Sequence, residues 1–581
     1  MQSEQRRKKK RFPKLKSHYY FFKYCALFLF LAFFLIFHGF SDSFLKPLLT
    51  SISMVFRRIS INNSSFELKV EDRVLFPDHL LFLVSKKGSN SLWSKGLECI
   101  YSSNLSEKVQ VQPVLSVDEY SELQSIARCP LVQPWNNSGL VQLRRSDGLV
   151  MMEEERGVHS WEMLVYAAEI DGETVVVFVK GLNLRPDRIS DPSQFRCRFS
   201  WFDLEENRNF TRTTNAVTAA QEIIRCSLPV SLRKDVAIMV PGVQVTVAMK
   251  ANPGLRTLIR SRRQGSFATF YPPVPSIAKI DIAHLNFKEP RKGRYELCVC
   301  TMLWNQAPPL REWIVYHAWL GVQRWFIYDN NSDDDIEKVI NELERENYNV
   351  SRHVWPWIKS QEAGFSHCVL RARSECRWVG FMDVDEFYYF PSPAFYHGKT
   401  SDVVYPGQNS LLSLVAKYSP SKRIGEIRTV CHSFGPSGLV SAPSQGVTTG
   451  YTCRLQSPER HKSIVRPDAI DETLLTVVHH FHLKRGYRYL NLLQHIAVIN
   501  HYKYQVWEVF RSKFHRRVAT YVTDWQENQN EGSKDRAPGL GTEPIEPRNW
   551  SRQFCEVWDT GLRDFVIANL AEPVSGSLPW E

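Results

Sequence analysis

Three common nucleotide- and metal-binding motifs are missing from this sequence of 581 residues. There is no Gly-x-x-x-x-Gly-Lys-Ser/Thr loop, which argues against a P-loop ATPase or kinase. No Gly-x-Gly-x-x-Gly follows the apolar strand expected at Glu296–Met302, which argues against a nicotinamide-dependent enzyme. No Cys-x-x-Cys pair or Cys/His finger spacing occurs, so we do not expect structural zinc.

The chain also has little net charge outside its N-terminus. The formal net charge is +12, but residues 1–23 hold nine Lys/Arg and one Glu and so carry +8 of it. The remaining residues are close to neutral for their number, which gives no support for nucleic-acid binding. Apolar residues make up 43% and charged residues 23%, which is the composition of a globular protein and not of a disordered or fibrous one.

A long apolar run follows the basic N-terminal segment. Residues 24–40 contain no charged side chain, and with residues up to 45 they are long enough to cross a bilayer core of about 30 Å. The positive-inside rule keeps residues 1–23 cytoplasmic and places residues 46–581 across the membrane. A cleaved signal peptide is the alternative, but the run is long for one and residues 39–43 form a poor cleavage site. We therefore expect an uncleaved, single-pass type II anchor at 24–45.

Sequons and cysteines agree with a chain that faces a lumen. Asn-x-Ser/Thr sequons occur at Asn62, Asn63, Asn104, Asn136, Asn209, Asn330, Asn349 and Asn549. One of the 12 cysteines, Cys25, lies in the expected anchor, which leaves eleven on the lumenal side. Some disulfides are plausible there, and because eleven is odd, at least one cysteine stays free or pairs with another chain. A homodimer is therefore left open.

The first half of the lumenal part has the pattern of a β protein. Residues 46–70 are rich in Ser and Asn and are predicted to be a stem. Residues 71–287 contain short apolar runs between Gly, Pro, Asn and Asp, which predicts a β-rich, sandwich-like domain. Expected strands include Leu80–Val84, Thr174–Val179 and Val243–Ala248, and Ala216–Arg225 is expected to be a short helix. A sugar-binding face is compatible with Trp93, Trp135, Trp161 and Trp201, although core packing is the more common role of each.

The segment 288–525 alternates between strand and helix patterns. Strands are expected at Glu296–Met302, Arg324–Tyr328, Arg352–Trp357 and Trp378–Met382. Three helices are expected between them, the second with Ile336, Val339, Ile340 and Leu343 on one face and Ser332 as its cap. This alternation predicts a mostly parallel, Rossmann-like sheet.

Acidic loops follow two of the expected strands, Asp329–Asp333 and Asp383-Val-Asp385. Ligands of parallel α/β sheets bind beyond the carboxyl ends of the strands. Carboxylates at i and i+2 of an extended chain point to one side, where they bind a hard divalent cation such as Mn²⁺ or Mg²⁺. Such a cation neutralises the charge of a departing diphosphate, which suits a nucleoside diphosphate sugar. A solvated turn is the alternative.

Several motifs follow one another between about residues 294 and 505. They are Leu303-Trp-Asn305, Glu312-Trp-Ile-Val-Tyr-His317, Leu320-Gly-Val322, Ile327-Tyr-Asp-Asn-Asn-Ser332, Trp378–Phe387, His461–Pro467 and Asn500-His-Tyr502. In this combination the chain resembles glycosyltransferase family 92, which contains plant β-1,4-galactan synthases. The β-rich first half is similar to the layout of those synthases, in which a carbohydrate-binding-like module precedes the catalytic domain.

The resemblance implies a GT-A fold in a Golgi membrane enzyme, with metal-dependent, inverting transfer from a UDP-sugar to a glycan or polysaccharide acceptor. UDP-galactose is the favoured donor. By position in the motifs, Asp383 and Asp385 would hold the metal and ribose, and Lys462 could face the diphosphate. The nucleotide pocket would be lined by Asn305, Asp329 and Asn331. GT-A enzymes often supply a late histidine to the metal, and the candidates here are His479, His480 and His501.

An inverting transfer needs a carboxylate that removes the proton of the acceptor hydroxyl. The candidates that the sequence leaves open are Glu386, Asp468, Asp471 and Glu472. Thr448–Thr452 and Phe434–Gly438 could border the acceptor, and a plain loop is the alternative for both. Residues 526–547 are expected to form a flexible loop, and Trp550–Leu570 a closing helix of the segment 526–581. A catalytically silent carbohydrate-binding protein and a metal-dependent phosphoesterase remain the alternative functions.

Overall fold

The computed structural model describes residues 69–85, 96–103, 106–121, 124–132, 139–146, 151–153, 157–182, 184–185, 187–203, 208–234, 242–250, 273–280, 295–391, 406–477, 479–521 and 546–581. The predicted cytoplasmic segment 1–23, the anchor 24–45, the stem up to residue 68 and most of the predicted loop 526–547 lie outside these ranges. Within them, no helix is both long and apolar enough to cross a bilayer.

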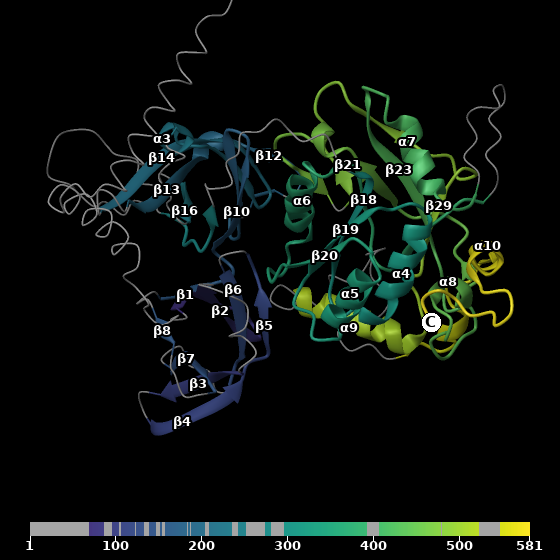
Figure 1. The fold of residues 1–581 in the computed structure, drawn as a ribbon, viewed down its shortest axis with the longest axis horizontal. Coiled ribbons are helices and arrows are strands. Elements are labelled where there is room, and N and C mark those ends of the chain that lie inside the picture. Colours follow the sequence, from purple (N-terminus) through teal and green to yellow (C-terminus); the bar gives the residue numbers. More distant parts are fainter. Residues whose placement is uncertain are drawn as a thin grey trace, which may run out of the picture. The chain divides into compact units, whose positions relative to one another are not determined.

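The first β layers form a two-sheet sandwich (Figure 1). One sheet contains β1 (Lys69–Leu75), β2 (His79–Ser85), β5 (Ser116–Glu119), β6 (Gln124–Pro130), β8 (Met152–Glu153) and β9 (Val158–Ser160), and the other contains β3 (Leu97–Ser103), β4 (Ser106–Pro113) and β7 (Gly139–Arg145). Side chains of β1 alternate between buried and half-buried, as expected for a strand with one face on a core. The Cys99–Cys129 disulfide joins the two sheets through this core, so the predicted sandwich is present.

A second β layer has its own apolar core. Its strands are β10 (Val165–Asp171), β11 (Thr174–Val179), β12 (Ile189–Ser190), β13 (Phe195–Asp203), β14 (Arg208–Ala220), β15 (Ile223–Ser227), β16 (Val243–Met249) and β17 (Lys279–Ile280). The helix predicted at Ala216–Arg225 is wrong, because these residues form the end of β14 and most of β15, with a turn at Gln221. Burial of Ala219 and Ile224 in the core, close to the Cys197–Cys226 disulfide, outweighs the local helix propensity. A short helix, α3 (Val230–Lys234), follows β15.

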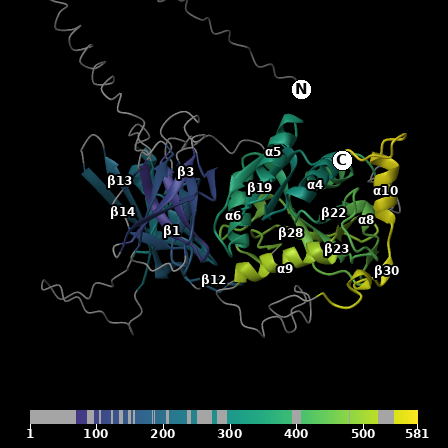
Figure 2. The same cartoon turned by 90° about the horizontal axis from the view of Figure 1, so that it is seen from below.

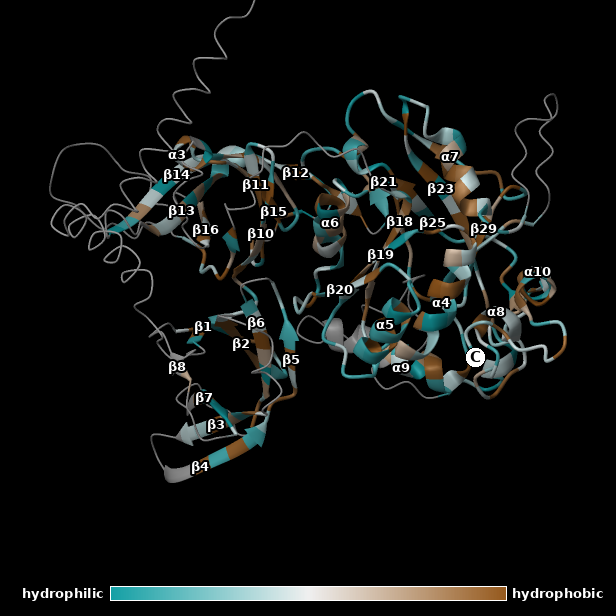
Figure 3. Ribbon diagram, viewed as in Figure 1, coloured by the Kyte–Doolittle hydropathy of each residue, from teal (hydrophilic) through white to brown (hydrophobic). Residues whose placement is uncertain are grey.

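The predicted Rossmann-like alternation is confirmed. The strands β20 (Val350–Val354), β19 (Arg324–Asp329), β18 (Tyr295–Leu303) and β21 (Cys376–Phe381) lie side by side and are parallel, and they alternate in sequence with α4 (Ala307–Trp319), α5 (Ile336–Arg345) and α6 (Gln361–Ala372). The sheet continues beyond β21 with β25 (His461–Val465), β23 (Ile424–Ser433), β29 (Val498–His501) and β22 (Glu386–Tyr389), and β28 (Arg488–Asn491) pairs with β23. Figure 3 shows how apolar residues concentrate on interior strands such as β2, which is buried along its whole length.

Two predicted helix features differ from the structure. Asp335, and not Ser332, precedes α5, because the Ser332 hydroxyl accepts a hydrogen bond from the Asn305 backbone N–H at 2.9 Å. The predicted closing helix Trp550–Leu570 is a 3₁₀ turn at Trp550–Arg552, the strand β30 (Val557–Trp558) and α10 (Gly561–Leu570). The Cys453–Cys555 disulfide and the pairing of β30 with β24 (Cys453–Arg454) hold the middle of this segment extended.

The other helices and short strands of this half follow β22 in the chain. They are α7 (Ser410–Tyr418), α8 (Val447–Gly450), β26 (Thr476–Val477), β27 (His480–Phe481) and α9 (Trp507–Tyr521), which is the long yellow-green helix of Figure 2. Two further disulfides, Cys298–Cys376 and Cys300–Cys368, tie β18 to β21 and α6. Cys431 is the cysteine of the described residues that has no disulfide, and its burial prevents it from linking two chains.

Candidate active site

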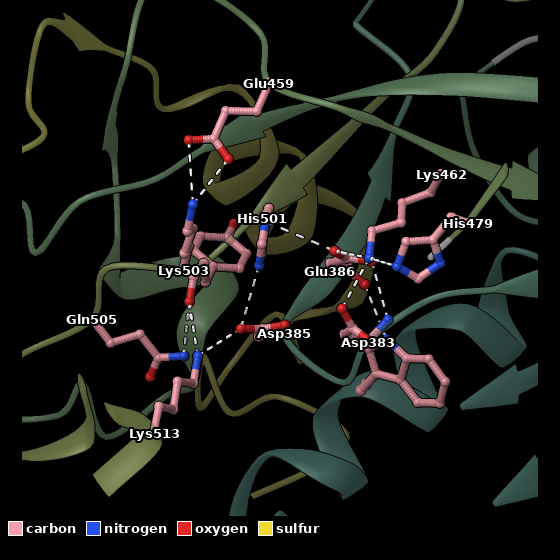
Figure 4. Close-up of polar contacts among 12 residues, drawn as sticks. Asp383, Asp385, Glu386, Glu459, Lys462, His479, His501, Lys503, Gln505 and Lys513 are labelled. Carbon is pink, nitrogen blue, oxygen red and sulfur yellow. Dashed lines mark hydrogen bonds and ion pairs between the residues drawn. The ribbon is translucent and has the colours of Figure 1, made fainter. Parts of the chain in front are cut away.

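The Asp383-Val-Asp385 segment lies in a tight turn at the end of β21. The Glu386 backbone N–H donates to the Asp383 carbonyl at 3.1 Å, and the Asp383 N–H donates to the Glu386 carboxylate at 3.0 Å. The chain is therefore not extended here, so the premise that Asp383 and Asp385 point to one side is wrong. Figure 4 shows their carboxylates directed to different partners, and the buried Glu386 side chain lies between the two groups.

Asp383 pairs with a lysine from the neighbouring strand β25. The Lys462 ammonium lies 2.9 Å from the Asp383 carboxylate, 2.7 Å from Glu386 Oε1 and 2.5 Å from His479 Nε2. Burial raises the pKa of Asp383, but Lys462 and His479 together lower it more, so that pKa lies below its ordinary value. Burial lowers the pKa of Lys462, but the carboxylates of Asp383 and Glu386 raise it by more. The pKa of Lys462 is therefore above its ordinary value, and Lys462 stays charged. His479, which was predicted as a metal ligand, thus accepts a hydrogen bond from the Lys462 ammonium.

Asp385 faces a second set of groups, from β29 and α9. The Lys513 ammonium lies 2.6 Å from the Asp385 carboxylate, and His501 Nε2 lies 3.6 Å from the same oxygen. The Asp385 carbonyl accepts a hydrogen bond from the Tyr502 N–H at 2.9 Å, which fixes the turn against β29. Burial raises the pKa of Asp385, but Lys513 and His501 lower it more, so the carboxylate is well below its ordinary pKa and stays ionised.

Three of these groups have the arrangement of a cation site. Within the described ranges, ligand atoms of Asp385, Glu386 and His501 lie within 4.8 Å of one another. Glu386 Oε1 is buried and accepts no hydrogen bond of normal geometry, although Lys462 is close to it. Carboxylate oxygens with one imidazole nitrogen suit Mn²⁺ or Mg²⁺. The residues therefore fit a divalent cation, with His501 as the late histidine and with Asp383 and His479 beside this group.

Lys513 competes for Asp385 with any cation that binds there. We expect Lys513→Met to tighten Mn²⁺ binding about 3- to 10-fold in the absence of nucleotide, because a positive charge 2.6 Å from Asp385 is lost. Mn²⁺ titration followed by electron paramagnetic resonance measures this affinity. Arg511→Met, an exposed position on the same helix, is the control, and unchanged or weaker affinity in Lys513→Met would contradict the competition.

Asp329 is buried below the loop that follows β19. One carboxylate oxygen accepts from the Ser332 N–H at 2.9 Å, and the other accepts from Arg352 Nε at 2.8 Å. Since the Asp329 side chain is fully buried and paired, it holds the loop, and its contact with a nucleotide stays a prediction. Asn331 has a positive φ and a buried Oδ1 without a partner, and Asn305 is hydrogen-bonded to Asp333. The ends of β18, β19 and β21 place all of these residues along one edge of the sheet.

Residues from the first β sandwich reach the Asp329–Ser332 loop. Arg352 bridges Asp329 at 2.7 Å and Asp118 of β5 at 2.8 Å, and both carboxylates are buried. Arg128 of β6 donates to the carbonyls of Asn331 and Ser332 at 3.3 and 3.4 Å. An aromatic core that includes Phe76, Tyr166 and Trp357 also joins the β layers to the α/β sheet. The β-rich half therefore helps to hold the Asp329–Ser332 loop in place. No sequence motif indicated this contact.

This support makes a prediction for Asp118. We expect Asp118→Asn to lower the free energy of unfolding by about 1.5–3 kcal/mol, because Arg352 loses one of its two buried charged acceptors. If the proposed donor binds along this edge, the KM for it should rise while kcat changes little. Denaturant unfolding and donor titration measure the two effects. Glu119→Gln at the adjacent exposed position is the control, and equal behaviour of the two variants would refute the supporting role.

The base candidates are in different surroundings. Burial raises the pKa of Glu386 to about 7, although Lys462 opposes the shift. Asp468 is exposed and pairs with Arg466, and the Asp471 carboxylate accepts from Thr473. None of these contacts selects the base.

Thr448, predicted to border the acceptor, is buried, where Glu312 accepts hydrogen bonds from the Thr448 hydroxyl and from the N–H groups of Val447 and Thr448. Thr448 thus anchors α8, and the contact of Thr448–Thr452 with an acceptor stays a prediction.

The sequence is similar to known proteins of one family. The model of glycosyltransferase family 92 matches residues 293–538. A family 92 protein of Ricinus communis is 54% identical over 100% of this chain and 99% of its own length, and one of Arabidopsis thaliana is 55% identical over 88% of this chain and 85% of its own length. Galactan β-1,4-galactosyltransferase GALS2 of Arabidopsis thaliana is 23% identical over 37% of this chain and 43% of its own length.

Solved structures resemble the chain more weakly. A mannosyltransferase from Pyrobaculum calidifontis, solved with GDP-mannose and Mn²⁺, is 11% identical and covers 41% of this chain and 69% of its own, with a TM-score of 0.22. At this TM-score the likeness supports no inference about the chain.

Proposed function

Because the chain belongs to glycosyltransferase family 92 and is therefore a glycosyltransferase, we propose that it transfers a hexose from a UDP-sugar to a glycan or polysaccharide acceptor. The reaction inverts the anomeric carbon and depends on Mn²⁺ or Mg²⁺. The observation that carries the proposal is the meeting of Asp385, Glu386 and His501 at the carboxyl end of β21, where an α/β sheet binds its ligands. Galactose is the favoured sugar, since GALS2 is named as a galactosyltransferase.

The chemistry of this proposal follows from the charges around the acidic turn. When bound, the cation acts as a Lewis acid on the donor diphosphate. Asp385, Glu386 and His501 would hold it, and the Lys513 ammonium, which bonds to Asp385, would lie close enough to serve the diphosphate oxygens. The acceptor oxygen forms a bond to the anomeric carbon, the bond from that carbon to the diphosphate breaks, and UDP leaves with the electron pair. A carboxylate takes the proton of the acceptor hydroxyl.

A donor screen tests this function. The purified full-length chain is mixed with UDP-galactose, UDP-glucose, UDP-xylose or GDP-mannose, with a panel of wall-polysaccharide oligosaccharides, and with or without Mn²⁺. We expect product with a UDP-hexose and Mn²⁺ only. The absence of any Mn²⁺-dependent UDP affinity would favour the silent carbohydrate-binding protein, and release of phosphate without an acceptor would favour the phosphoesterase.

We also propose that residues 24–45 anchor the chain in the Golgi membrane with residues 46–581 in the lumen. The support is the charge asymmetry around the apolar run. Protease treatment of sealed Golgi vesicles from cells that express the chain should remove an N-terminal tag and leave a C-terminal tag intact. Loss of the C-terminal tag from sealed vesicles would contradict this orientation and indicate the opposite one.

A further inference from the structure

Four of the eight sequons have their asparagine in the described part of the chain, and their side chains differ. They are Asn209, Asn330, Asn349 and Asn549. An N-linked glycan is joined to the amide nitrogen Nδ2 of the asparagine, so this atom must face solvent and must not be needed by the fold. The surroundings of Nδ2 can therefore separate the sequons that tolerate a glycan from those that do not.

The amide nitrogens of two sequons are part of the fold. Asn330 Nδ2 donates to the backbone carbonyls of Trp355 and Trp357 at 2.6 and 3.2 Å. Asn349 Nδ2 donates to the Tyr295 hydroxyl at 2.7 Å, where that half-buried group ties the start of β20 to β18. A sugar on Nδ2 replaces one of its two hydrogens, so Asn330 would lose at least one of its two hydrogen bonds. At Asn349 the sugar would have to share the nitrogen with the Tyr295 hydroxyl, 2.7 Å away. We therefore expect these two amides to disfavour a glycan.

The other two asparagines are exposed. Asn209 lies in β14, and Asn549 precedes the 3₁₀ turn Trp550–Arg552 in the left-handed conformation. The amide of neither forms a hydrogen bond with a described residue. A glycan at these positions therefore removes no hydrogen bond between the asparagine amide and a described residue.

The Asn209 position also offers a surface for the first sugar. In the β13–β14 pairing Asn209 lies opposite Phe202, and Trp201 lies opposite Phe210 one residue further along. Directly opposed residues share a face of the sheet, with Cβ atoms about 4.5–5.5 Å apart. Phe202 is therefore on the Asn209 face, and it is 42% exposed. An exposed phenyl ring is a stacking surface for the apolar face of a sugar ring.

We propose that Asn209 and Asn549 carry N-linked glycans, that Asn330 and Asn349 do not, and that the first sugar at Asn209 covers Phe202. The inference rests on the lumenal placement proposed above. The glycan comes from a lipid-diphosphate-linked oligosaccharide. Nδ2 forms a bond to the anomeric carbon, the bond between that carbon and the diphosphate oxygen breaks, the lipid diphosphate leaves with the electron pair, and one amide proton passes to a base of the transferring enzyme.

Glycopeptide mapping tests the occupancy. The full-length chain is expressed in plant cells, treated with peptide:N-glycanase A in H₂¹⁸O and digested, and ¹⁸O-labelled aspartate is located by mass spectrometry. We expect label at positions 209 and 549 and none at 330 and 349. Label at 330 or 349 would overturn the proposal, and so would its absence at 209 while Asn62, Asn63, Asn104 or Asn136 is labelled. Absence at all eight sites would overturn the lumenal placement, whereas Mn²⁺-dependent UDP binding by the same sample tests the enzyme function separately.

A pair of variants tests the contact with Phe202. Thr211→Ala removes the sequon and keeps Asn209, and Phe202→Ser removes the ring. We expect Thr211→Ala to lower the melting temperature by about 1–2 °C in the natural background and by less than about 0.5 °C in the Phe202→Ser background. Equal shifts in both backgrounds would refute the stacking contact. Treatment of both chains with the glycanase provides the same comparison without a change at residue 211.

Discussion

Replacement of Asp385 by Asn is expected to reduce sugar transfer by about 10³-fold and to abolish Mn²⁺-dependent UDP binding. Asp385 contributes to the Asp385–Glu386–His501 group, and it is the residue that both Lys513 and His501 face. An amide oxygen carries no net charge, so the variant loses the attraction for a cation while it keeps the shape of the side chain. Initial rates with a UDP-sugar and isothermal titration with UDP and Mn²⁺ measure the two losses.

The fold should tolerate this change. Asp385 lies in a turn at the edge of the sheet. Asn keeps its backbone hydrogen bond with Tyr502 and still offers an oxygen to the Lys513 ammonium. Asp564→Asn, an exposed position on α10, controls for a general effect of losing a carboxylate. Transfer by Asp385→Asn at the natural rate would rule out the proposed site, and so would a loss of transfer with Mn²⁺-dependent UDP binding intact.

Replacement of Lys462 by Met is expected to have the largest effect on stability, about 3–5 kcal/mol in the free energy of unfolding. Lys462 neutralises Asp383 and Glu386, and Glu386 is completely buried. Without the ammonium, two neighbouring carboxylates face each other with no cation, so Glu386 should become protonated and the turn should loosen. Denaturant unfolding at pH 7 measures the change.

A double variant separates charge from packing in this experiment. In Lys462→Met/Glu386→Gln a neutral amide replaces the Glu386 carboxylate, so Asp383 no longer faces a second negative charge. We therefore expect about half of the lost stability to return. In the natural chain the Glu386 carboxylate accepts a hydrogen bond from the Asp383 N–H. The neutral Gln side chain still offers an oxygen for this hydrogen bond. Lys422→Met, at an exposed lysine, should change stability by less than about 0.5 kcal/mol. No recovery in the double variant would show that the loss comes from packing of the lysine stem.

The elements were predictable where local patterns decide them. Apolar spacing located β18, β19, β21 and the helices between them, and the short apolar runs located β2, β11 and β16. Prediction failed at Ala216–Arg225 and at Trp550–Leu570, where burial of particular side chains and a disulfide impose extended backbone on helix-like composition. A local pattern contains neither the core that a segment meets nor the partner of its cysteine.

The candidate site shows the same division. The motif Asp383-Val-Asp385 at the end of an apolar strand was sufficient to locate an acidic site, and His501 was among the histidines named for it. The i and i+2 rule failed because it assumes extended backbone, whereas a hydrogen-bonded turn from Asp383 to Glu386 directs the two aspartates to different partners. The same turn brings Glu386, the residue after the motif, close to Asp385 and His501, with which it forms the candidate cation site.

What the sequence by itself determined is the family, the order of strands and helices, and the strand end that carries the acidic residues, because each of these is encoded in residues close together in the chain. The tertiary structure decided which charges meet. Lys462 reaches Asp383 across 79 positions, Lys513 reaches Asp385 across 128, and Arg352 reaches Asp118 across 234. Such pairs form only when packed strands and helices bring distant side chains within a few ångströms, where burial makes each charge depend on its partner.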